Sequence, residues 1–132
     1  MATVSDAELV MKLYDLRREK LLREAREFVV FKFQPKDLEE LQAAAKETAH
    51  WRQTISYWEM AASLVMQGAL DPALFLESNG EGIFIYTKFH PLHAAREKEG
   101  GNAFMPQTAG LIERYPAAKA RHEAIKTALG QA

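Results

Sequence analysis

The sequence contains no cysteine in its 132 residues. This absence excludes disulfide bonds, thiolate nucleophiles and cysteine-ligated zinc or iron–sulfur sites. No apolar run approaches the roughly 20 residues that a helix needs to cross a bilayer. The first ten residues, MATVSDAELV, also lack the basic region and apolar core of a secretory signal. We therefore predict a cytoplasmic protein that does not associate with membranes.

The chain has almost no net charge. It carries 17 lysines and arginines against 18 aspartates and glutamates, which gives a formal charge of -1. Proteins dedicated to nucleic-acid binding normally show a basic excess. The one segment dense in arginine, residues 17–26, is interleaved with glutamates, so its charges largely cancel on the helix surface. We expect no nucleic-acid partner.

What the sequence does contain is helical periodicity. Between residues 47 and 75, apolar side chains recur at spacings of three and four, which places them on one stripe of a helix. This stripe consists of Trp51, Ile55, Trp58, Ala62 and Val65. Gly68 is suited to the left-handed conformation that ends a helix, and Asp71-Pro72 is typical of the start of the next one. The same logic predicts a helix start at Asp37, and at Pro116 either a kink in the final helix or a new start.

The N-terminus predicts one long helix. Ser5 and Glu8 have the spacing of a capping box, and the periodicity that follows continues for about 25 residues. Its apolar stripe, which includes Leu9, Leu13 and Leu16, is wider than one neighbouring helix would cover. We therefore predict a homodimer formed through one face of this helix.

Two short segments are ambiguous between strand and helix. Residues 28–33, FVVFKF, and residues 82–89, GIFIYTKF, are rich in β-branched and aromatic side chains and too short for periodicity to decide. Two strands here would make the protein α+β. We favour helix for both, because each adjoins a long helical pattern. The prediction is one all-α domain over residues 1–132, a bundle of about five helices.

The aromatic side chains are numerous for so small a bundle. They include Trp51, Tyr57, Trp58, Phe84, Tyr86, Phe89 and Tyr115. We predict that they form the core, with indole and phenol groups reaching polar partners at its edge. The alternative is that some of them line a ligand pocket or an oligomer interface.

Histidines supply the only candidate metal ligands. His90, His93 and Glu97 are spaced so that they can face one way on a helix, and three such groups could hold zinc. The simpler interpretation pairs His93 with Glu97 on the surface. Glu47 and His50 match the Glu-x-x-His spacing of di-iron bundles, but that architecture needs a second copy, which this chain lacks. We predict no cofactor and no catalytic constellation.

Three motifs carry a family resemblance. They are Tyr57-Trp58-Glu59, then Leu64-Val65-x-x-Gly68-x-Leu70-Asp71, and Tyr86 followed by Pro91 and Arg96. This pattern, from Tyr57 to Arg96, resembles a widespread bacterial family of small helical domains of unknown function. The chain departs from it at Thr87, where the family usually has tryptophan. The resemblance implies an all-helical fold and a buried ion pair between Glu59 and Arg96 that fixes helix register.

These patterns favour a non-catalytic protein-interaction or scaffold module. The alternative is a helical bundle that binds a small ligand or a metal, with enzymatic activity left open, through His90, His93 and Glu97 beside the aromatic residues 86–89.

Overall fold

A computed structural model describes residues 1–131, and every regular element in that range is helical. The elements are α1 Val4–Arg17, α2 Lys20–Glu27, the π-helix η1 Phe28–Lys32, α3 Leu38–Glu47, α4 His50–Met66, α5 Pro72–Ser78, α6 Glu81–Lys98, α7 Pro106–Arg114 and α8 Pro116–Ala128. The all-α prediction is confirmed. The predicted number of about five helices is wrong, because these residues form eight α-helices.

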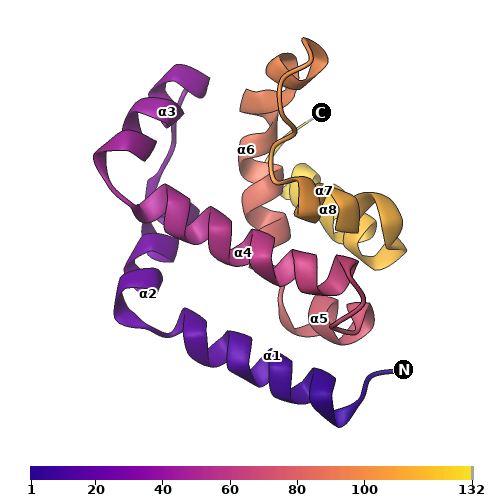
Figure 1. The fold of residues 1–132 in the computed structure, drawn as a ribbon. Coiled ribbons are helices and arrows are strands. Elements are labelled where there is room, and N and C mark those ends of the chain that lie inside the picture. The colour runs from indigo at the N-terminus through magenta and orange to yellow at the C-terminus, as the bar shows by residue number, and fades with distance from the viewer. Residues whose placement is uncertain (132) are drawn as a thin grey trace.

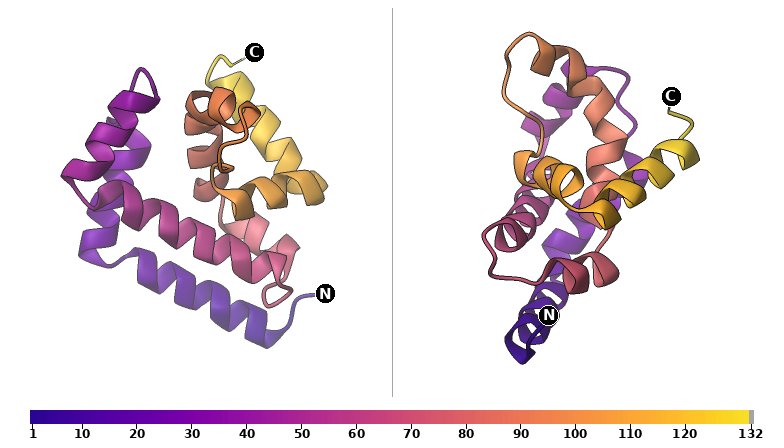
Figure 2. Two further views of the ribbon diagram at one scale, coloured as in Figure 1. Left: turned by 45° about the horizontal axis from the view of Figure 1, so that its top comes forward. Right: turned by 90° about the vertical axis from the view of Figure 1, so that its right-hand side faces the viewer.

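Helix α4 lies at the centre of the molecule (Figure 1). Helices α1 and α2 run along one side of it, and α6, α7 and α8 pack on the other side (Figures 1 and 2). Trp58 of α4 is 1% exposed at the middle of this arrangement. Tyr57, Tyr86 and Phe89 are also buried, so the prediction of an aromatic core is confirmed for these side chains.

The predicted long N-terminal helix is broken. Helix α1 ends at Arg17, and Glu19 takes an extended conformation with ψ 139° before α2 begins. The Glu19 carboxylate then accepts a hydrogen bond of 3.0 Å from the Leu22 amide, which makes it the N-cap of α2. The first cap is also displaced from its predicted place: Thr3 and Asp6 form the capping box instead of Ser5 and Glu8.

Both ambiguous segments are helical, as predicted. Residues 82–89 lie within α6, whereas residues 28–32 form a π-helix, which a sequence pattern does not distinguish from an α-helix. Two carbonyl groups of this π-helix accept hydrogen bonds from a side chain of α6. The Lys88 ammonium donates to the carbonyls of Val29 at 3.2 Å and Val30 at 3.0 Å. Burial lowers the pKa of Lys88.

The predicted stops and starts after residue 34 hold. Asp37 caps α3 through the Glu40 amide, and Asp71 caps α5 with Pro72 at the first turn. Gly68 has φ +81°, as a helix terminator requires. A separate break at Thr48 divides α3 from α4, and Pro116 starts α8.

A polar cluster joins four helices beside Trp58. Arg26 of α2 binds Glu81 of α6 through two hydrogen bonds of 2.8 and 2.6 Å. The Trp58 indole N–H also lies 3.4 Å from Glu81 Oε1. A third Arg26 nitrogen donates to the Arg17 carbonyl at 3.1 Å, so the same side chain holds the end of α1. This cluster fixes α1, α2, α4 and α6 relative to one another.

Replacement of Arg26 should therefore be costly. We expect Arg26→Ala to lower the free energy of unfolding by about 2–3 kcal/mol, because Glu81 would be left without its charged partner. The Glu81 side chain is only 20% exposed. Urea denaturation measures the change. Arg23→Ala, an exposed position on the same helix, should alter it by less than about 0.5 kcal/mol. Equal effects of the two replacements on the free energy of unfolding would contradict the stabilising role given to the Arg26–Glu81 pair.

Candidate functional site

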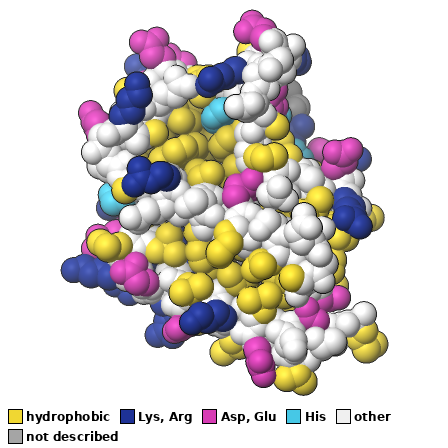
Figure 3. Space-filling model, in the orientation of Figure 1, with side chains coloured by type: hydrophobic (Ala, Val, Ile, Leu, Met, Phe, Trp, Pro, Cys, Tyr) yellow, Lys and Arg dark blue, Asp and Glu magenta, His cyan; other side chains and the backbone are white. Residues whose placement is uncertain are grey.

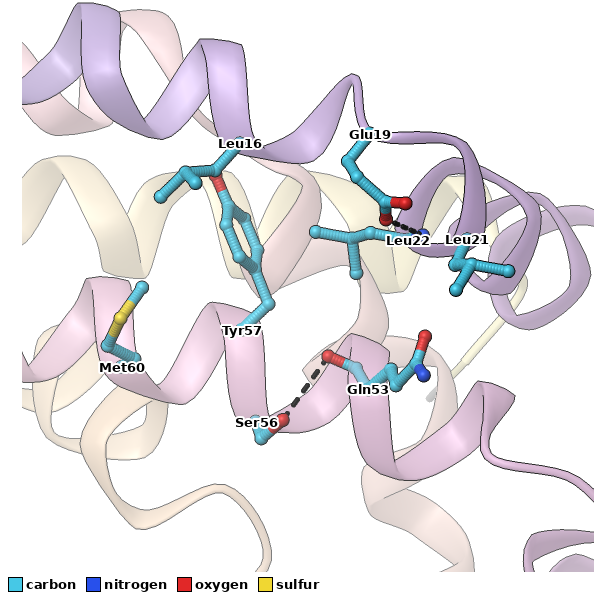
Figure 4. Close-up of a pocket in the computed structure, with 8 residues that line it drawn as sticks. All are labelled: Leu16, Glu19, Leu21, Leu22, Gln53, Ser56, Tyr57 and Met60. Atoms are coloured by element: carbon cyan, nitrogen blue, oxygen red, sulfur yellow. Dashed lines mark hydrogen bonds between the residues drawn. The ribbon is translucent and has the colours of Figure 1, made fainter.

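An apolar groove opens on the surface between α1–α2 and α4. Its volume is about 570 Å³. Figure 4 shows Leu16, Leu21 and Leu22 along one wall and Met60 and Tyr57 along the other. Glu19, Gln53 and Ser56 complete the lining. Hydrophobic side chains gather across the middle of the face drawn in Figure 3.

The side chains of this groove are unusually exposed for their type. Leu16 is 41% exposed, Leu21 60% and Met60 43%. An isolated exposed apolar residue is ordinary, whereas several that share one depression mark an interaction surface. Two of the polar groups of the lining are already engaged: the Glu19 carboxylate caps α2 and the Ser56 hydroxyl donates to the Gln53 backbone carbonyl. The groove thus offers contact area and few free hydrogen-bonding groups.

Tyr57 lines the groove and is itself buried. Its hydroxyl donates a hydrogen bond to the Leu13 carbonyl of α1. Burial raises the pKa of this phenol, so it stays neutral and acts as a donor at physiological pH. The bond ties α4 to α1 and sets the width of the groove.

The three candidate metal ligands do not assemble into a metal site. His90 Nε2 lies 2.8 Å from Glu97 Oε1, whose other oxygen accepts the Phe104 amide at 2.7 Å. His93 instead donates its Nδ1 hydrogen to the Phe89 carbonyl and stacks on the Phe104 ring at 4.0 Å. Within residues 1–131, no three His, Asp or Glu side chains are arranged to hold a metal ion. The pairing of Glu97 is with His90 and not with His93.

The family resemblance implied an ion pair between Glu59 and Arg96, and the structure gives Glu59 other partners. Both carboxylate oxygens bind the start of α7: they accept the Gln107 and Thr108 amides at 2.9 Å and the Thr108 hydroxyl at 2.7 Å. No salt bridge to Arg96 occurs in the described part of the chain. The reason lies in α7, which has no side-chain cap of its own. Glu59 supplies that cap from α4.

The segment that Glu59 holds is strained. Met105, just before α7, has φ 44°, a left-handed conformation that a side chain other than glycine or asparagine rarely adopts. Met105 is nonetheless 3% exposed, so its packing and the Glu59 bonds together hold the turn in place. Glu59 has a structural function in this arrangement.

Comparison with known proteins now adds one finding. Residues 2–115 match the family described as "Domain of unknown function (DUF4760)". The chain belongs to this family. The match ends at Tyr115, so it includes α1 to α7 and leaves out α8. No curated protein and no solved structure matches the chain significantly. In the part of the chain that is described, no helix has both the length and the apolar character needed to span a membrane.

Sequence reasoning missed two features of these sites. The groove went unnoticed because it depends on the break at Glu19, where the sequence continues with good helix formers. The environment of Thr87, described below, had a usable signal in Pro91, since a proline inside a helix removes the hydrogen bond to the carbonyl four residues earlier.

The partner of Glu59 can be tested directly. We expect Glu59→Ala to lower the free energy of unfolding by about 2 kcal/mol, because three hydrogen bonds at the start of α7 are lost. Arg96→Ala should change it by less than about 0.5 kcal/mol. A double-mutant cycle measured by urea denaturation should give no coupling between the two. Coupling above about 1 kcal/mol would restore the ion pair that the resemblance implied.

The pH dependence of stability follows from His93. Burial is the largest cause of its lowered pKa, so the unfolded chain binds a proton more readily than the folded one. Stability should therefore fall as the pH drops below about 6.5, the ordinary histidine value. The His93→Gln variant should lose less stability than the wild type between pH 7 and 5.5 in urea denaturation. An identical loss in both proteins would exclude His93 as a contributor.

Proposed function

We propose that this protein is a non-catalytic interaction module that forms a homodimer through the groove between α1–α2 and α4. The observation that carries the proposal is the exposure of Leu16, Leu21 and Met60 around a single depression of about 570 Å³. Burial of such side chains against a partner is favourable by about 25 cal/mol per Å² of apolar area.

The charges of the molecule support a second copy as the partner. A formal net charge of -1 gives two copies almost no long-range repulsion. Near the groove, basic and acidic residues alternate along α1 and α2, so a symmetric pair can place charges of opposite sign opposite each other. A patch of a single sign would instead favour a partner of the opposite charge.

The residues that line the groove also support an interaction function rather than catalysis. Its lining is mainly apolar, and its only ionisable side chains are Glu19 and Tyr57. Glu19 serves as a helix cap and Tyr57 is held by the Leu13 carbonyl. Neither group is free to transfer a proton to a bound substrate.

Sedimentation velocity over a range of protein concentrations tests the proposal. The wild type should form dimers, and Leu21→Asp should raise the dimer dissociation constant at least about tenfold, because it places a charge in the apolar contact. Leu21 is 60% exposed, so the fold should be retained, which circular dichroism can check.

Phe31→Asp is the matched control. Phe31 is 76% exposed on the π-helix, outside the groove, and its replacement changes the net charge by the same amount. This variant should dimerise like the wild type. A wild type that remains monomeric at all concentrations would refute the homodimer. Equal effects of the two variants on the dimer dissociation constant would mean that the dimer contact does not lie in the groove.

A further inference from the structure

Pro91 creates a distinctive polar environment on α6. It lies inside the helix and has no amide hydrogen, so the Thr87 carbonyl loses its normal partner. The side chain of Gln131, beyond α8, donates to that carbonyl at 2.9 Å. The Thr87 hydroxyl donates to the Ile83 carbonyl at 2.8 Å. Thr87 is fully buried, and both its carbonyl and its hydroxyl group are engaged in hydrogen bonds.

These hydrogen bonds determine which ring nitrogen of His122, on α8, carries the hydrogen. Its Nδ1 lies 2.7 Å from the Thr87 hydroxyl oxygen. Because the hydroxyl hydrogen is already committed to Ile83, Nδ1 must carry the hydrogen and donate it. The other ring nitrogen, Nε2, then makes no hydrogen bond within residues 1–131. His122 thus keeps one ring nitrogen available in a fixed orientation.

His122 lies in a cleft of about 430 Å³ between α6 and α8. The cleft is lined by Tyr86, Thr87, His90, Pro91, His122, Lys126 and Gln131. Residues four apart on one helix share a face, so Tyr86 and His90 form one side and His122 and Lys126 the other. Tyr86 stacks on His90 on the α6 side, with ring centroids 4.8 Å apart, and meets His122 of α8 edge-on across the cleft at 5.6 Å.

The charges in this cleft are of one sign. No carboxylate lines it, and Lys126 forms no salt bridge in the described residues. Two acidic groups lie close by. Glu97 is engaged with His90 and the Phe104 amide, and Glu123 is on α8 beside His122. Burial, Lys126 and His90 all lower the pKa of His122, while Glu123 raises it.

We propose that this cleft binds a small organic anion, with its oxyanion group held by Lys126 and His122 and its body in the cleft beside Tyr86. An oxyanion would accept a hydrogen bond from the Lys126 ammonium and, once His122 takes up a second proton at Nε2, another from that nitrogen. The negative charge of the bound anion favours this second protonation and so opposes the effect of burial on the pKa of His122. The volume suits a small molecule, and clefts with an aromatic wall and a few convergent polar groups are the usual form of such sites. The α8 side of the cleft, with His122 and Lys126, lies beyond the matched residues 2–115, whereas the α6 side lies within them.

Two probes separate the chemical sources of the oxyanion. Inorganic phosphate and benzoate are each titrated into the ¹⁵N-labelled protein at pH 6, and amide and imidazole signals are followed by NMR. We expect saturable shifts at Tyr86, His90, His122 and Lys126, with a dissociation constant near about 1 mM, the range of small fragments. Saturation by phosphate alone assigns a phosphate group, and saturation by benzoate assigns a carboxylate on an apolar body.

Variants of α8 provide the decisive comparison. Lys126→Gln should weaken binding at least about fivefold, because a charge-assisted bond is lost. Lys119→Gln removes the same charge from an exposed position on α8 away from the cleft and should leave binding unchanged. His122→Asn should also weaken binding. If the His122 variant fails to fold, Lys126→Gln still tests the proposal.

Either of two results would overturn the proposal. One is the absence of saturable shifts at the cleft residues with both probes up to about 50 mM, far above the expected dissociation constant. The other is equal binding by Lys126→Gln and Lys119→Gln, which would mean that the anion is held by general charge and not by the cleft.

Discussion

The carboxylate of Glu81 is the interaction on which this arrangement of helices depends. It lies in the first turn of α6, where a negative charge is favoured by the helix dipole, and it accepts hydrogen bonds from α2 and α4. Arg26 brings the end of α1 into the same cluster. Four helices therefore meet at one partly buried pair of charges. Apolar packing around Trp58 supplies bulk stabilisation, but it is non-directional and does not by itself specify how helices are oriented.

The same principle recurs at the start of α7. That helix begins at a buried, strained residue and lacks a local cap, so a carboxylate from α4 takes the place of one. In both cases a charged side chain satisfies groups on an element distant in sequence. Such groups connect the N-terminal helices to the C-terminal ones across α4, and they explain why Glu59 and Glu81 are partly buried at the edge of an apolar core.

Local signals in the sequence predicted much of the fold. Asp37, Asp71, Pro72 and Pro116 mark helix starts through chemistry within one turn, and Gly68 marks a stop through its backbone freedom. The break at Glu19 had no such signal, since arginine, glutamate and lysine are all good helix formers and the extended turn is held by Arg26 from outside.

The surroundings of Glu59 and the cleft between α6 and α8 were harder to predict, because each depends on helices that are distant in sequence. The partners of Glu59 lie 48 and 49 residues away, and no periodicity encodes them. The sequence spacing paired Glu97 with His93, whereas the structure pairs Glu97 with His90, and the other side of the cleft at His90 comes from α8. The contact of His122 with Thr87 joins residues 35 apart, so no local pattern on α8 indicates it.

The corner between α1 and α2 has a consequence for recognition. Arg26 of α2 holds the Arg17 carbonyl and Tyr57 of α4 holds the Leu13 carbonyl, so the α1 wall of the groove is attached at two fixed points. A partner that docks there meets a preorganised surface and orders only side chains such as Leu21. Little conformational entropy is then lost by the backbone on association, and more of the apolar contact energy is retained as affinity.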